Sequence, residues 1–78
     1  MNNFTQIFYD RESDVLYLSI GEPRRAISRE VGDDVLLRID PETENVVGLT
    51  IMNLASRFGE IESPQSVPVS IDLHELTN

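Results

Sequence analysis

Residues 35–52 constrain the fold more than any other stretch, because their pattern is that of a β-hairpin. Two apolar runs, Val35–Ile39 and Val46–Met52, flank a polar break that contains Pro41 and Asn45. Runs of β-branched and aliphatic residues on either side of Pro, Asp and Asn are typical of two antiparallel strands joined by a turn. The rest of the chain must then supply the surfaces that cover this pair.

The register of the hairpin follows from the placement of its apolar residues. Pairing Ile39 with Val46 would set Gly48 against the apolar row, whereas pairing Ile39 with Val47 keeps apolar residues opposite one another. A slip of one residue turns every side chain to the other face of the sheet. We therefore predict the second register, with an inward row of Val35, Leu37, Ile39, Val47, Leu49 and Ile51.

An earlier hairpin is predicted between residues 4–9 and 15–20, because both runs are rich in aromatic and branched residues. The five polar residues 10–14 make a permissible loop, so we expect Tyr9 to pair with Val15. One face of this hairpin then carries Phe4, Phe8, Leu16, Leu18 and Ile20. The opposite face carries Thr5, Ile7, Tyr9, Val15, Tyr17 and Ser19.

A polar but alternating run, residues 24–31, is predicted to form a further strand that turns at Gly32 into the 35–39 strand. We expect Val31 to pair with Val35, with a bulge near Arg29 as the alternative. Ala26, Ser28, Glu30, Leu36 and Arg38 would share one face. There Arg38 would lie diagonally from Glu30, within reach of a cross-strand pair.

Residues 53–58 change character, since Leu54 and Phe58 are four apart and Gly59 follows. This spacing predicts a short helical turn. After a connector, residues 67–73 alternate again, and Pro68 confines them to a sheet edge or to an arm docked on the sheet. Residues 73–78 are compatible with a frayed helical turn.

The chain of 78 residues is expected to be a single small domain, residues 1–78, with a core over 4–58 and a connector and extended C-terminal arm over 59–78. The predicted fold class is mainly β, an antiparallel sheet of five or six strands with one short helical turn near residues 53–58. Such a short chain buries only about 60–65% of its unfolded surface. Because there is no Cys, no disulfide can stabilise it, and oligomerisation is the remaining way to enlarge its core.

The net charge of the chain bears on the kind of partner that it can bind. Fourteen acidic residues stand against six basic ones, all Arg, for a formal net charge of −8. Nucleic-acid affinity comes largely from cationic side chains, so direct binding of DNA or RNA is disfavoured. An acidic surface suits a basic partner protein or serves solubility alone. No signal-peptide pattern and no apolar run of membrane-spanning length are visible, so we expect a cytoplasmic protein with no membrane partner.

Four arginines, Arg24, Arg25, Arg29 and Arg38, form a local basic concentration. They can seat an acidic segment or a phosphate, or they can pair with nearby carboxylates. We favour ion pairing with Glu22, Glu30, Asp33 and Asp40.

Motifs for catalysis or metal binding are weak. Asp10, Glu12 and Asp14 resemble the start of a calcium loop, but Val15 stands where such a loop needs Gly. His74 is the single His, and zinc requires three or four ligands. No Gly-x-Ser-x-Gly elbow or phosphate loop occurs. We expect no enzymatic activity and no cofactor, with a small-ligand or divalent-metal site at Asp10, Glu12 and Asp14 as the alternative function.

Several segments together resemble a known family. They are Tyr9-Asp10-x-x-x-Asp14-Val15-Leu16-Tyr17-Leu18, Ser28-x-Glu30-Val31, Val35–Thr43, Val46-Val47-Gly48-Leu49-x-Ile51 and Asn53-x-Ala55-Ser56-Arg57. This series, over about residues 7–58, is similar to domain of unknown function 2283, a group of small bacterial and archaeal proteins. The resemblance implies a small antiparallel sheet with little helix and transfers no catalytic residues. Members resemble the small partner of two-gene modules of toxin–antitoxin type.

The chain departs from that pattern at two places. Glu44-Asn45 stands where the family has Gly in a turn, and we expect Asn45 to take the left-handed conformation. Thr50 stands where the family favours an acidic residue, so a site that needs a carboxylate there is in doubt.

The second face of the predicted sheet carries the candidate interaction residues. They are Ile7, Tyr9, Val15, Tyr17, Leu36, Arg38, Val46 and Met52. An apolar patch of this size is larger than a small monomer normally leaves exposed. The arm, a second copy of the chain or a different protein could cover it. We predict a non-catalytic interaction module, homodimeric, that docks an acidic and aromatic surface on a partner, with an antitoxin-like role as one form of this function.

Overall fold

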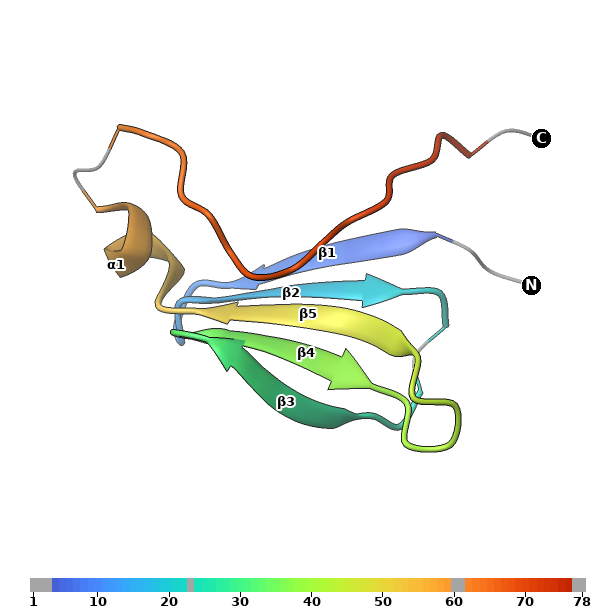
Figure 1. The fold of residues 1–78 in the computed structure, drawn as a ribbon. Helices are drawn as coiled ribbons and strands as arrows, with labels where there is room; N and C mark the ends of the chain where they lie inside the picture. Colours follow the sequence, from blue (N-terminus) through green and yellow to red (C-terminus); the bar gives the residue numbers. More distant parts are fainter. Residues whose placement is uncertain (1–3, 23, 60–61, 77–78) are drawn as a thin grey trace.

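The computed structural model of the protein describes residues 4–22, 24–59 and 62–76. They form one antiparallel sheet and a short helix (Figure 1). The elements are β1 (Thr5–Asp10), β2 (Val15–Ile20), β3 (Ile27–Gly32), β4 (Val35–Ile39), β5 (Val46–Met52) and α1 (Leu54–Phe58). The predicted fold class is confirmed, with five strands and the helix at the predicted place.

The order of strands in the sheet is β1-β2-β5-β4-β3, so the last strand in sequence lies at the centre. β3, β4 and β5 follow one another as hairpins, and β5 then pairs with β2. This is a Greek-key arrangement, in which a longer connection carries the chain from β2 to the far edge of the sheet. Each strand was predicted, but the insertion of β5 between β2 and β4 was not.

The register of β4 and β5 was predicted correctly over most of the hairpin. Leu37 pairs with Leu49, and Val35 pairs with Ile51. The pairing at the turn was wrong, because an irregularity between Arg38 and Ile39 shifts the register and sets Ile39 opposite Val46. A bulge of this kind lets one strand carry an extra residue without moving the rest of its row.

The register of β1 and β2 differs from the prediction by one residue. Tyr9 pairs with Leu16, and Asp10 pairs with Val15. The strand extends to Asp10 because the Asp10 carboxylate accepts hydrogen bonds from the backbone N–H groups of Glu12 (3.1 Å) and Ser13 (3.4 Å) and closes a shorter turn. The slip exchanges the faces of every β1 side chain relative to β2.

The β3–β4 pair follows the predicted register from Ile27 to Glu30, and a bulge lies at its turn end. Gly32, not Val31, pairs with Val35. The β4–β5 turn also departs from expectation, because Glu44 takes the left-handed conformation (φ 62°) that was expected of Asn45.

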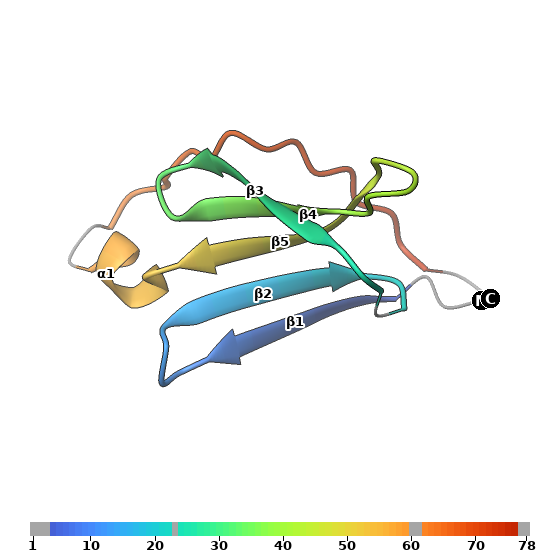
Figure 2. The same ribbon diagram turned by 90° about the horizontal axis from the view of Figure 1, so that it is seen from below.

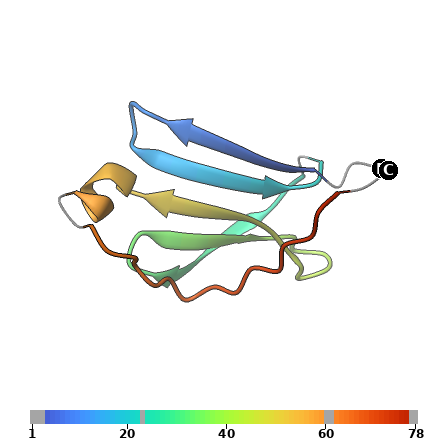
Figure 3. The same cartoon turned by 90° about the horizontal axis from the view of Figure 1, so that it is seen from above.

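The C-terminal arm, residues 62–76, contains no strand and runs on one side of the sheet, along β3 and β4 (Figures 1 and 3). Val67 and Val69 are half-buried, and Pro68 lies beside Gly32 at the turn end of β3. The Gln65 side chain donates a hydrogen bond to the backbone carbonyl of Arg57 in α1. Of the two predicted placements, a sheet edge or a docked arm, residues 67–73 do not form an edge strand. Residues 73–76 form no helical turn, and residues 77–78 lie outside the described residues.

The core is small. Among the described residues, the buried hydrophobic side chains are Val15, Val35, Ile39 and Leu49, and Val35 is 0% exposed. The molecule exposes 6475 Å², whereas a compact monomer of 8.8 kDa exposes about 4800 Å². The described residues therefore leave large hydrophobic side chains exposed, among them Phe8 at 62% and Ile7 at 68%.

Candidate interaction surface

Figure 2 shows the face of the sheet opposite the arm, where the beginning of β3 crosses in front of β4 and the strands β1, β2 and most of β5 are not overlaid by another segment. Cross-strand pairs in an antiparallel sheet share a face, so the pairing assigns the side chains of this face. Phe8 pairs with Tyr17, Tyr17 with Thr50 and Thr50 with Leu36, which makes one continuous row across four strands. We define the open face as Phe8, Tyr17, Leu36, Thr50 and Met52; Val15 points to the same side but is buried.

Aromatic stacking marks one side of the open face. The rings of Phe8 and Tyr17 are stacked, with centroids 6.2 Å apart and planes inclined by 18°. Phe8 is 62% exposed, and Tyr17 is half-buried. Stacked aromatic side chains provide a large, rigid contact area that loses little conformational entropy on binding.

The rest of the open face has an uncharged centre and charged residues toward β3. Leu36 and Thr50 continue the aromatic row, Met52 lies beside it, and Glu30 pairs with Leu36 at the β3 end of the row. Thr50 lies near the centre of this face, between Tyr17 and Leu36, and adds no charge there.

Five of the eight predicted interaction residues lie on this side of the sheet: Val15, Tyr17, Leu36, Arg38 and Met52. Arg38 pairs with Gly48 at the border of the open face. No ion pair joins Arg38 and Glu30 within 4 Å in the part of the chain that the structure describes.

The placement of Ile7, Tyr9 and Val46 on this face was wrong. Ile7 pairs with Leu18 and Tyr9 with Leu16, on the arm side, because of the one-residue slip in the first hairpin. Val46 lies on the arm side because the bulge sets it opposite Ile39. Phe8 takes their place on the open face. The sequence feature that could have predicted this placement is Asp10. An Asp at the start of a turn often accepts hydrogen bonds from the backbone N–H groups two or three residues later.

Asp14 joins the first turn to the end of β5 and to α1. It has a left-handed backbone (φ 59°), and its carboxylate accepts a hydrogen bond from the backbone N–H of Ala55 (2.9 Å to Oδ1). Its carbonyl accepts a hydrogen bond from the N–H of Leu54 (3.1 Å). The Tyr9 hydroxyl donates to the same carboxylate at 2.5 Å.

These hydrogen bonds shift two pKa values. The Tyr9 hydroxyl, followed by the Ala55 N–H, lowers the pKa of Asp14 because both donors stabilise the carboxylate. The same Asp14 hydrogen bond raises the pKa of Tyr9, since ionisation of the hydroxyl would remove the donated proton. The pair therefore holds an ionised Asp14 and a neutral Tyr9 between the acid and alkaline ranges.

The metal alternative at Asp10, Glu12 and Asp14 finds no support in this geometry. The carboxylates of Asp10 and Asp14 are engaged with backbone N–H groups of the turn and of α1. Among the residues that the structure describes, no three His, Cys, Asp or Glu side chains lie close enough to hold a metal ion.

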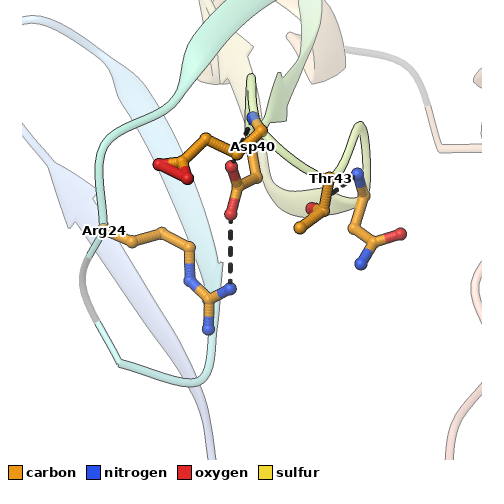
Figure 4. A network of polar contacts seen from close by, with 5 residues as sticks. Arg24, Asp40 and Thr43 are labelled. Carbon is orange, nitrogen blue, oxygen red and sulfur yellow. Dashed lines mark hydrogen bonds and ion pairs between the residues drawn. The ribbon is translucent and has the colours of Figure 1, made fainter.

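The basic concentration is only partly paired. Arg24 and Asp40 form an ion pair of 3.6 Å at the β4–β5 turn, as expected (Figure 4). Asp40 also accepts the N–H of Glu42 (2.8 Å), and Thr43 accepts the N–H of Asn45 (3.2 Å). For Arg25 and Arg29, no ion pair within 4 Å occurs in the described ranges.

A pocket of about 180 Å³ separates part of the arm from the sheet. Leu18, Leu37 and Leu49 form its floor, and Val69 and Ile71 lie on the arm side. The arm meets the rest of the chain at Pro68, which lies beside Gly32, and at its start through the Gln65 hydrogen bond.

Comparison with known proteins decides the family. The model of the family described as "Protein of unknown function (DUF2283)" matches residues 6–54, which is 49 of the 78 residues. The chain belongs to the DUF2283 family. No curated protein and no solved structure matches it.

The DUF2283 match begins at the second residue of β1, covers the other four strands and ends at the first residue of α1. The open face and Asp14 lie inside the matched region, whereas Ala55 and the arm lie beyond it. No helix in the described part of this DUF2283 chain is long and apolar enough to cross a membrane.

Proposed function

We propose that this DUF2283 chain is a non-catalytic protein-interaction module whose open face docks onto a partner protein with an apolar centre and a basic border. The observation that carries the proposal is the open face itself, which displays the Phe8–Tyr17 stack, whereas the arm lies on the other side of the sheet. Tyr, Phe and Met are enriched at protein interfaces, and charged residues are depleted at interface centres.

The border of the open face favours a basic partner. The β1–β2 turn carries Asp10 and Glu12, the β3–β4 turn carries Asp33 and Asp34, and the β4–β5 turn carries Glu42 and Glu44. Acidic turns therefore flank both ends of the open face. Two copies stacked face to face would bring these turns together at the same sign of charge, which disfavours a second copy as the occupant.

An antitoxin-like role is the specific form of this proposal. In that form the partner is the basic product of a neighbouring gene, and docking occludes the partner's own working surface. The acidic border would accelerate association and make it salt-dependent, because exposed charges are screened as ionic strength rises.

The test is binding of the purified neighbouring gene product by calorimetry, with two matched variants on one strand. Phe8→Ser changes the open face at a residue that is 62% exposed, and Ile7→Ser changes the arm side at a residue that is 68% exposed. We expect Phe8→Ser to weaken binding at least tenfold and Ile7→Ser to change it less than threefold. We also expect affinity to fall when salt is raised from about 50 to about 500 mM.

Two results would contradict the proposal. One is the absence of any complex at about millimolar concentration. The other is an equal loss of affinity in Phe8→Ser and Ile7→Ser, which would place the contact on the edge strand and not on the open face.

A further inference from the structure

The two edges of the sheet are built differently. β3 carries the charged residues Arg29 and Glu30, has a bulge at its turn end, and has Pro68 of the arm beside Gly32. These are the devices by which sheet edges avoid pairing with other chains. β1, at the other edge, pairs with β2 in an unbroken register and has one charged residue, Asp10, at its end.

The side chains of β1 are exposed on both faces of the sheet. Ile7 is 68% exposed on the arm side, and Phe8 is 62% exposed on the open face. An edge strand with apolar residues on both sides gains from a strand placed next to it, because both side chains then lose contact with water.

The backbone of β1 presents a regular set of outward groups. The N–H of Gly21 donates to the carbonyl of Phe4 at 3.0 Å, which makes Phe4 and Gly21 a hydrogen-bonded pair of the β1–β2 ladder. Hydrogen-bonded and non-hydrogen-bonded pairs alternate along an antiparallel ladder. The N–H and C=O groups of Thr5, Ile7 and Tyr9 therefore point away from β2, toward the edge.

We propose that β1 pairs antiparallel with β1 of a second copy and joins the two five-stranded sheets into one. The twofold axis is normal to the sheet and passes between the two Ile7 residues. This axis keeps each face on its own side, so a residue can face only a residue of the same side. With Ile7 opposite Ile7, Thr5 of each copy faces Tyr9 of the other, and every outward backbone group of the three residues finds a partner.

A register shifted by one residue pairs fewer of the outward backbone N–H and C=O groups. With Phe8 on the axis, Ile7 faces Tyr9 and Thr5 of both copies stays unpaired, while the Phe8 backbone already bonds β2. The symmetric arrangement also suits the charge of the chain. Antiparallel pairing places the two Asp10 residues, and the acidic turns that follow them, at opposite ends of the joint.

The dimer leaves both open faces accessible, whether or not they bind a partner protein. The axis normal to the sheet sets the two open faces side by side on one surface, with the Phe8–Tyr17 stacks nearest the joint. The exposed Ile7 side chains meet on the arm side. The dimer thus buries β1 without covering either open face.

The experiment measures molar mass by light scattering on the whole chain. The wild type is expected to form a dimer of twice 8.8 kDa, 17.6 kDa, at about 100 µM. Ile7→Lys and Ile7→Glu are each expected to raise the dimer dissociation constant at least tenfold, because like charges would face each other across the axis. An equimolar mixture of the two variants is expected to restore the dimer. The matched control, Ile27→Lys on the other edge strand at a residue 52% exposed, should leave the mass unchanged.

Hydrogen exchange of the wild type tests the register without any substitution. The outward amides of Thr5, Ile7 and Tyr9 should exchange at least tenfold more slowly in the dimer than in the diluted monomer. A wild type that remains at 8.8 kDa up to about millimolar concentration overturns the proposal. So does a dimer in which these three amides stay unprotected, or one that Ile27→Lys dissociates and Ile7→Lys does not. None of these outcomes bears on binding through Phe8, which has its own test.

Discussion

Truncation of Val35 to Ala measures how far the arm and the sheet form one core. Val35 lies on β4 at 0% exposure, in the row whose Gly32 partner contacts Pro68 of the arm. Removing two buried methyl groups forfeits about 1.6 kcal/mol of transfer free energy, at about 0.8 kcal/mol each. A residual cavity of about 50 Å³ adds about 1.2 kcal/mol at about 24 cal/mol per Å³. The free energy of unfolding should therefore fall by about 3 kcal/mol.

That loss is a large share of the stability of a domain of this size, which is typically about 5 kcal/mol. Urea denaturation followed by circular dichroism gives the free energy directly if the slope stays constant. Val46→Ala is the control, because Val46 is 45% exposed and should lose only about 1 kcal/mol. The melting temperature of Val35→Ala should fall by at least about 12 °C. Equal losses in the two variants would refute the reasoning, since they would show that the arm does not exclude water from Val35.

Two further predictions concern single positions in the sheet. Gly48→Ala should lower the free energy of unfolding by about 1–3 kcal/mol, because the new Cβ would lie 2.8 Å from the backbone carbonyl oxygen of Leu18. Urea denaturation measures this change. An unchanged free energy would mean that β2 and β5 separate more easily than their pairing implies. The Tyr9–Asp14 hydrogen bond should stabilise the fold only where Asp14 is ionised and Tyr9 is neutral. Because the folded-state pKa of Asp14 is lowered, its contribution is present above about pH 4 and is lost as pH falls through the folded value. Because the pKa of Tyr9 is raised, the contribution is present below about pH 10 and is lost above it. Asp14→Asn, which tolerates the left-handed backbone, should reduce the acid dependence of the unfolding free energy, and a wild-type dependence in this variant would contradict the assignment.

The local pattern of apolar and polar residues predicted the strands and the helix well, but it predicted the turns between them less well. The alternation of Val35, Leu37, Leu49 and Ile51 set the register of the central hairpin, because apolar side chains opposite one another leave a single consistent pairing. The errors lie at turns. Asp10 closes a shorter turn with its own side chain, and that contact moves Phe8 to the open face and Ile7 away from it. The spacing of hydrophobic residues carries no information on such a contact.

The sequence predicted which types of residue form the candidate surface, but not every individual residue that lies on it. Val15 and Tyr17 share a face of β2 because of strand periodicity, but they share it with Met52 and Leu36 because β2 pairs with β5 and β5 with β4. The exclusion of Ile7 depends on one turn, and the exclusion of Val46 depends on one bulge. Each is decided by hydrogen bonds of a few residues and then transmitted along the whole strand, since the period of a strand is two.

The sequence by itself determined that this DUF2283 chain is a strand-rich, acidic domain with a short helix and an arm that cannot join a sheet interior. These properties follow from residue types and their spacing, which act locally. Only the tertiary structure decided that β5 lies between β2 and β4, and that the arm covers the face of Val35 and leaves that of Tyr17 open. Both faces are apolar enough to be buried, so periodicity could not choose between them. The chain leaves β5 into α1, and Asp14 of the β1–β2 turn fixes the start of α1 through hydrogen bonds with Leu54 and Ala55. The position of α1 then sets the side of the sheet on which the arm continues.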